Sequence, residues 1–125
     1  MAAPEVIFLT CDMYRETYAA KVRSNSTLGQ KINAFLVAKR DAPLQPFGSS
    51  DKPYQGKGIF NSVVPGLRHA HLTHDISIVY TISGTKPKVI KLYGLFGHDE
   101  SGTGTPPNPK KQKSLAVRMG NQSFS

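Results

Sequence analysis

Histidines that can do acid–base chemistry gather in one short segment of the chain. Three of the four histidines fall within six residues, beside an arginine and an aspartate: Arg68, His69, His71, His74 and Asp75. The fourth, His98, stands where a run of strand-forming residues ends. Histidine is the side chain whose unperturbed pKa lies nearest neutral pH. In a chain of net charge +8, this cluster predicts proton transfer on a polyanionic substrate.

Alternation along a strand would place His69 and His71 on one face, with their Cα atoms about 7 Å apart. Arg68 would then point to the opposite face. Asp75 begins the next expected strand, and from there its carboxylate can orient the imidazole of His71 and favour its charged form. The alternative is that these are ordinary histidines at the edge of a sheet, followed by a turn aspartate.

The same spacing is compatible with metal binding, because histidine is a common zinc ligand. A catalytic zinc needs three protein ligands and partners that orient them. The lone cysteine, Cys11, rules out a cysteine cluster and an internal disulfide. We therefore expect no metal and no cofactor, and keep a metal-dependent hydrolase as an alternative.

The charge balance points to an acidic partner. Lys and Arg total 16 against 8 Asp and Glu, which favours a nucleic acid over a basic surface with no specific role. Lys110, Lys111 and Lys113 open the last expected helix and can hold phosphates, or can simply be solvated. Phe124, near the end of the chain, can fold back and offer a ring for base stacking.

The 125 residues fit a single domain, residues 1–125. No apolar run approaches the ~20 residues that a membrane helix needs. The first residues also lack the pattern of a signal peptide. We therefore expect a cytoplasmic protein.

The apolar pattern predicts an α+β domain, with an N-terminal strand and two helices packed on an antiparallel sheet, and a C-terminal helix. Strands are expected over residues 5–10, 67–72, 75–83 and 88–96. Helices are expected from a cap at Thr10 or Asp12 to about residue 23, from residue 28 to Pro43, and over 110–121. Residues 41–66 form a long loop with a short structured piece at 58–64.

The second expected helix has two distinct faces. Its apolar stripe consists of Leu28, Ile32, Phe35 and Leu36. The other face carries Lys31, Lys39 and Arg40.

The order and spacing of several short motifs resemble the RelE/ParE toxin superfamily. The motifs are Asp51-Lys52-Pro53-Tyr54-Gln55-Gly56, then Arg68-His69-Ala70-His71 with Asp75 and the strand Ile76-Ser77-Ile78-Val79-Tyr80, then Gly97-His98. They look most like the YafQ branch, and the closing Lys-Gln-Lys followed by Ala-x-Arg-Met is similar to the end of YafO-type toxins. The clear match covers residues 51–98.

The resemblance implies a small RelE-like fold and an mRNA interferase of a toxin–antitoxin system. Such an enzyme cuts messenger RNA in the ribosomal A site without a metal, and a bound acidic antitoxin holds it inactive. The RNA 2′-hydroxyl attacks the adjacent phosphate. By matching position, His71 would be the general base or an orienting group, Asp75 its partner and His98 the general acid. Arg68 would stabilise charge on the phosphate.

The chain departs from this family pattern at three points, one of which is that the loops at 41–66 and 99–109 are longer than in compact members. Lys52 stands where the family has a histidine, and a lysine can stabilise the phosphate or act as a base if nearby cations lower its pKa. The aromatic residue that follows the late histidine in YafQ has no counterpart, since Gly102 falls there, and Phe124 is the candidate to replace it. His69 joins Lys52 in the expected RNA-binding set. The alternative function is a non-enzymatic basic module that binds RNA or, like ParE-type relatives, gyrase.

Overall fold

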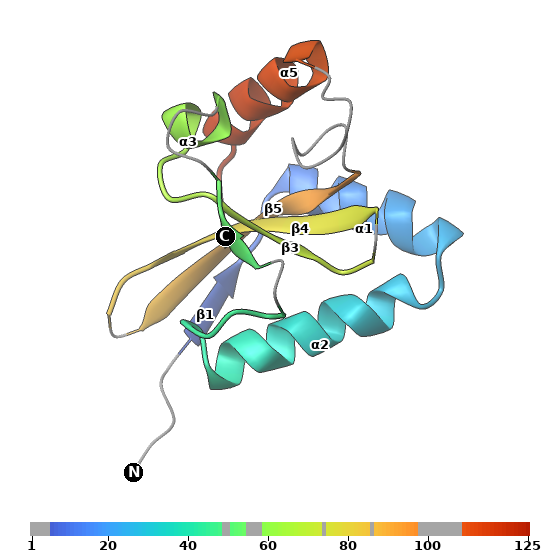
Figure 1. Cartoon of the computed structure of the whole chain (residues 1–125), viewed down its shortest axis with the longest axis vertical. Coiled ribbons are helices and arrows are strands. Elements are labelled where there is room, and N and C mark those ends of the chain that lie inside the picture. Colours follow the sequence, from blue (N-terminus) through green and yellow to red (C-terminus); the bar gives the residue numbers. More distant parts are fainter. Residues whose placement is uncertain (1–5, 49–50, 55–58, 74, 86, 98–108) are drawn as a thin grey trace.

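The protein folds into a sheet of five strands with helices packed on it (Figure 1). A computed structural model describes residues 6–48, 51–54, 59–73, 75–85, 87–97 and 109–125. The strand order is β1-β5-β4-β3-β2. The strands are β1 (Val6–Leu9), β2 (Lys52–Pro53), β3 (Arg68–His71), β4 (Ile76–Ser83) and β5 (Lys88–Gly97). The helices are α1 (Asp12–Ser24), α2 (Leu28–Asp41), α3 (Ile59–Val63) and α5 (Pro109–Gly120). The predicted α+β class is confirmed.

The sheet is mixed rather than wholly antiparallel as expected. Strands β2 to β5 pair antiparallel with their neighbours, but β1 lies parallel to β5, with Phe8 opposite Ile90. The chain leaves β1 through two helices before it reaches the rest of the sheet. A connection of this length permits a parallel pair, which a hairpin turn does not.

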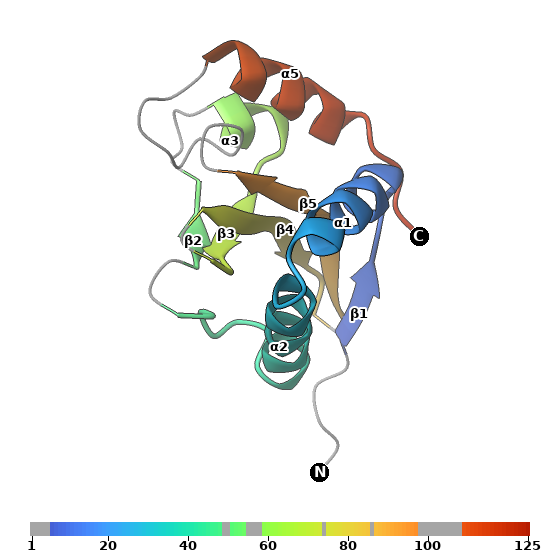
Figure 2. The same cartoon turned by 90° about the vertical axis from the view of Figure 1, so that its right-hand side faces the viewer.

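Helices α1 and α2 cover one face of the sheet (Figure 2). Phe35 of α2 packs edge-on against Tyr80 of β4, with ring centroids 5.1 Å apart. The Thr17 hydroxyl of α1 accepts a hydrogen bond from the Leu95 N–H of β5 at 3.1 Å. Helices α3 and α5 lie side by side at one end of the sheet, as both views show. None of the helices described is long and apolar enough to cross a membrane.

The buried face of α2 contains a charge that the sequence analysis placed outside it. Leu28, Ile32 and Phe35 are buried as predicted, but Lys39 is only 1% exposed. The expectation that Lys39 lies on the other face is wrong. Lys39 follows Phe35 by four residues, so it continues the apolar stripe by one more helical turn.

Some local predictions need correction. Helix α1 begins at Asp12, with Cys11 as its N-cap and no side-chain cap bond, so neither Thr10 nor Asp12 has the capping role expected. The structured piece predicted at 58–64 is confirmed as α3. The short strand β2 falls within a stretch expected to be loop.

The C-terminal segment folds back onto the start of the chain. Thr10 and Ser125 exchange two backbone hydrogen bonds, each 3.0 Å long. The ring of Phe124 packs against Tyr93, with centroids 4.7 Å apart, and the Lys91 ammonium lies 5.5 Å from its centre. Phe124 thus folds back as expected, onto β5.

Candidate active site

The two histidines of β3 lie on the face of the sheet that α1 and α2 leave uncovered. The Arg68 side chain instead reaches the helix-covered face, where its Nε donates to the Tyr80 hydroxyl at 3.2 Å. Since side chains alternate along a strand, His69 and His71 point to the opposite side. The predicted separation of Arg68 from the two histidines is therefore confirmed.

Two further residues share this face through strand register. Lys52 of β2 pairs with His69, and Ser77 of β4 pairs with His71. Directly opposed residues on neighbouring strands project to the same side. We call the surface formed by Lys52, His69, His71 and Ser77 the histidine face. Lys52 is exposed, His71 is half-buried, and the other two are buried.

A row of four rings crosses this face, from Phe60 of helix α3 at one end to His71 of β3 at the other. The centroids of Phe60 and Tyr54 are 4.9 Å apart, those of Tyr54 and His69 are 4.6 Å apart, and those of His69 and His71 are 6.1 Å apart. His69 stands inside the row and is 7% exposed. His71 stands at the end of the row and is more accessible to a ligand.

This position gives His69 unusual acid–base behaviour. Burial, and then the charges of His71 and Lys52, lower the pKa of His69 to about 4. At neutral pH its imidazole is therefore uncharged. His69 can form hydrogen bonds to a phosphate or a base, but it cannot supply positive charge. The exposed ammonium of Lys52 is the positive charge next to it.

Three buried polar atoms on this side have no hydrogen-bond partner among the described residues. They are the Tyr54 hydroxyl, His69 Nδ1 and Ser77 Oγ. A buried polar group without a partner costs about 1–3 kcal/mol. Because all three belong to the ring row or the histidine face, they mark this region as one suited to a polar ligand.

Asp75 belongs to the turn between β3 and β4. The Thr73 hydroxyl donates to its Oδ1 at 2.7 Å, and the Asp75 N–H donates back to that hydroxyl at 3.3 Å. The side chain is exposed. Strand β4 begins one residue later than expected, at Ile76.

The opposite face of the sheet holds a buried charge cluster. The Asp51 carboxylate accepts from Lys39 Nζ at 2.6 Å, from the Phe47 N–H at 2.7 Å and from the Tyr80 hydroxyl. Arg68 Nη2 lies 3.5 Å from the same carboxylate. Burial alone would raise the pKa of Asp51, but the hydrogen bonds from Lys39, Tyr80 and Phe47 outweigh it and hold the pKa below its usual value. Asp51 is thus ionised at neutral pH.

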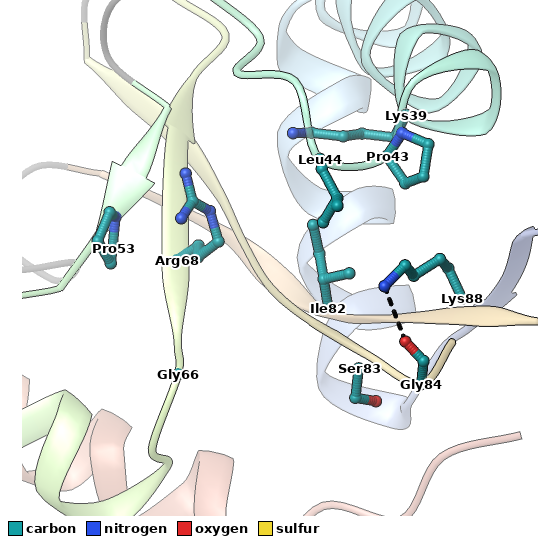
Figure 3. Close-up of a pocket in the computed structure, with 10 residues that line it drawn as sticks. All are labelled: Lys39, Pro43, Leu44, Pro53, Gly66, Arg68, Ile82, Ser83, Gly84 and Lys88. Carbon is teal, nitrogen blue, oxygen red and sulfur yellow. Dashed lines mark hydrogen bonds between the residues drawn. The ribbon is translucent and has the colours of Figure 1, made fainter. Parts of the chain in front are cut away.

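A pocket of about 330 Å³ lies beside this cluster, lined by Lys39, Leu44, Pro53, Arg68 and Lys88 among others. In Figure 3 the charged ends of Lys39 and Arg68 point toward one another across it. Neither His69 nor His71, the two histidines that the structure describes, lines this pocket.

The remaining predicted site residues lie elsewhere or outside the described residues. His74 and His98 fall outside them, and so does the side chain of Lys111. Lys110 and Lys113 are exposed on α5. Phe124 packs on β5, whereas the histidines lie on β3, with β4 between these strands. The structure therefore brings together Lys52, His69 and His71 of the predicted set.

The hydroxyl of Ser77 is a part of this region that was not among the predicted site residues. For Ser77 the signal was present, since the alternation of β4 places it on the face opposite Ile76 and Ile78. Within the described residues, no group of three histidine, cysteine or acidic side chains is placed to hold a metal ion.

Solved bacterial toxins have a similar fold. A YoeB/ParE toxin from Agrobacterium tumefaciens gives a TM-score of 0.58 at 17% identity, over 75% of this chain and 98% of that one. A chain of the E. coli DinJ–YafQ toxin–antitoxin complex gives 0.55 at 15% identity, over 78% and 94%. A copper-bound mutant toxin from Helicobacter pylori gives 0.51 at 16% identity, over 78% and 97%.

No protein-family model matches the sequence, and no curated protein compared with it matches. The likeness to the solved toxins, at identities of 15–17%, is one of fold. The chain has the RelE-like fold that its motifs predicted.

Proposed function

We propose that this protein is the toxin of a toxin–antitoxin pair and cleaves messenger RNA at the ribosome. The observation that carries the proposal is the placement of Lys52, His69 and His71 on one face of a RelE-like sheet. Basic and imidazole groups side by side suit a phosphodiester, which needs charge stabilisation and proton transfer. The net charge of +8 suits both an RNA substrate and an acidic antitoxin.

The proposed reaction is a transfer within the RNA strand and needs no metal. His71 takes the proton of the 2′-hydroxyl, the freed oxygen bonds to the adjacent phosphorus, and the bond from phosphorus to the 5′-oxygen breaks. His98, assigned from the resemblance, gives its proton to the leaving 5′-oxygen. Lys52 stabilises the negative charge that develops on the phosphate.

The two histidines of β3 have different proposed roles. His69 is neutral over the whole neutral range because of its lowered pKa, so it is a poor proton acceptor at the pH of the reaction. We assign it hydrogen bonding to the RNA. His71, which is less buried, is the proposed proton acceptor. Asp75, one residue before β4, is the proposed partner that favours the charged form of His71.

The test is mapping of transcript 5′ ends after brief induction in bacterial cells. Wild type, His71→Ala, His98→Ala and Lys31→Ala are compared, the last because Lys31 is exposed on α2. We expect new in-frame cuts within translated regions for the wild type and Lys31→Ala, and their loss in both histidine variants. Growth arrest without such cuts would overturn the RNase proposal and favour a non-enzymatic target such as gyrase.

The antitoxin part of the proposal has its own test. One of the solved structures of similar fold comes from a toxin–antitoxin complex. We expect co-expression of the protein encoded by a neighbouring gene, small and acidic, to restore growth and to copurify with this chain. Growth arrest that no neighbouring gene relieves would contradict it.

A further inference from the structure

We infer that Asp51 and Arg68 are positioning residues that hold Lys52 beside His69. This inference deepens the proposed function and rests on it, because it concerns the same histidine face. It also reassigns Arg68, which the family resemblance places on the phosphate.

Strand β2 is attached to the sheet by few backbone bonds. It contains only Lys52 and Pro53, and the backbone of Pro53 makes no bond to β3, because bonds in an antiparallel ladder fall at every second pair. The next bond is from the Tyr54 N–H to the carbonyl of Leu67, the residue before β3, at 3.0 Å. So short a pairing leaves the register of Lys52 against His69 weakly determined by the backbone alone.

The residue before Lys52 provides a further attachment through its side chain. Asp51 is fully buried as a side chain and meets Lys39 of α2, Tyr80 of β4 and Arg68 of β3. These partners come from three separate elements, so they hold Asp51 in one place. Because neighbouring residues of a strand project to opposite sides, an Asp51 fixed toward α2 directs Lys52 toward the histidine face.

Arg68 binds the backbone of Asp51 as well as its side chain. Its Nη2 donates to the Asp51 carbonyl at 3.3 Å, while its Nε donates to Tyr80. Arg68 is also the β3 residue that pairs with Pro53. The guanidinium thus joins β2 to β3 by side-chain bonds at a pair of residues whose backbone groups do not bond one another, because hydrogen bonds in an antiparallel ladder fall at every second pair.

Energetics favour a role in placement for this cluster. Moving ionised groups out of water costs several kcal/mol per ion, so buried ion pairs add little net stability. A buried cluster that includes both Lys39 and Asp51, with side chains 1% and 0% exposed, is better explained by the single arrangement it imposes. That arrangement places Lys52 in register with His69.

The first readout is the pKa of His69, measured by NMR titration of the full chain without RNA. Lys52→Ala is introduced into the wild type and into Arg68→Met, which keeps the aliphatic stem and the Lys39–Asp51 pair. We expect Lys52→Ala to raise the pKa of His69 in the wild type, and to raise it less than half as much in Arg68→Met. An equal rise in both backgrounds, or no rise in the wild type, would overturn the inference.

The second readout is cleavage of messenger RNA on translating ribosomes by the same four proteins. We expect Arg68→Met to slow cleavage between about tenfold and a hundredfold, and to add less than about twofold once Lys52→Ala is present. Effects that multiply would mean that Arg68 contacts the RNA directly, and would overturn its positioning role. If the wild type cleaves no RNA, the proposed function fails, and the titration still decides whether Arg68 places Lys52.

Two further variants serve as a second test and a control for these measurements. Tyr80→Phe removes the hydroxyl that joins Arg68 to Asp51 and should change both readouts in the same direction if Arg68→Met does not fold. Arg40→Met makes the same substitution at an arginine that is 62% exposed, and both readouts should stay at the wild-type values.

Discussion

The side-chain oxygen of Gln122 accepts a hydrogen bond from the backbone N–H of Met13 at 3.3 Å, across 109 residues of sequence. The first N–H groups of a helix have no partner within the helix. Cys11, the N-cap of α1, provides no side-chain acceptor for them. Gln122 takes over this capping role from the other end of the described chain.

We therefore expect Gln122→Ala to lower the free energy of unfolding by about 1 kcal/mol, the usual cost of losing a cap. The measurement is urea denaturation followed by circular dichroism. Asn121→Ala is the matched control, since the Asn121 side chain is exposed and its described bond uses only the backbone. Equal midpoints for the two variants would contradict the capping role.

Lys39→Met should destabilise the protein by about 3 kcal/mol, because it leaves the Asp51 carboxylate buried without its closest cation. Denaturant unfolding measures the loss. Lys31→Met, at an exposed lysine of the same helix, should change stability by less than about 0.5 kcal/mol. Adding Asp51→Leu to Lys39→Met should restore part of the loss. A Lys39→Met protein as stable as the wild type would show that the buried Asp51 carboxylate does not require this cation.

Acid should destabilise the protein through His69. Its pKa falls from 6.5 in the unfolded chain to about 4 in the folded one, so the unfolded chain binds more protons between these values. The resulting stability is present above pH 6.5 and is lost as the pH falls toward 4. We expect a loss of about 2 kcal/mol between pH 7 and pH 5 from this residue.

His69→Phe tests this attribution. It keeps a ring between Tyr54 and His71 but removes the titration. Unfolding free energies measured at pH 7 and pH 5 should differ less in His69→Phe than in the wild type. An unchanged difference would assign the acid sensitivity to other groups.

Alanine substitutions at two glycines should change the stability of the protein in opposite directions. At Gly94 of β5, an added Cβ would lie 2.5 Å from the Phe96 ring and 3.1 Å from the Thr17 hydroxyl, so Gly94→Ala should cost about 1–3 kcal/mol. At Gly29 of α2, the nearest atom is a Val22 methyl at 3.7 Å, and Gly29→Ala should gain about 0.5–1 kcal/mol. Melting temperatures of the two variants relative to wild type would check both signs.

Much of the fold follows from periodicity in the sequence. Alternation in β3 predicts that Arg68 and His69 face opposite ways, and the Arg68–Tyr80 hydrogen bond agrees. Strand β2 could not be predicted in this way, because two residues that include a proline carry no alternating pattern. The place of Lys39 could have been inferred from its spacing after Phe35, but a lysine is rarely buried without a partner. That partner, Asp51, follows 12 residues later and carries no local signal.

The sequence predicts which strand carries the two histidines, but it does not predict how their acid–base properties differ. The shared face of His69 and His71 follows from spacing alone. The difference between the two imidazoles depends on Tyr54, whose ring packs against His69, and on Phe60 behind it. The sequence around Tyr54 has no alternating pattern, so the packing of its ring against His69, with the burial that lowers the pKa of His69, could not be foreseen.

Because Arg68 and His69 are adjacent and point to opposite faces of the sheet, the site depends on the number of residues in the turn that precedes β3. Gly66, at a φ of 83° that favours glycine, turns the chain into β3 just before these residues. An insertion or deletion of a single residue at this turn would slide β3 by one position and exchange its two faces. The guanidinium would then face the rings of Tyr54 and Phe60, and an imidazole would face Asp51. The number of residues in this turn therefore fixes both the charge cluster and the histidine face.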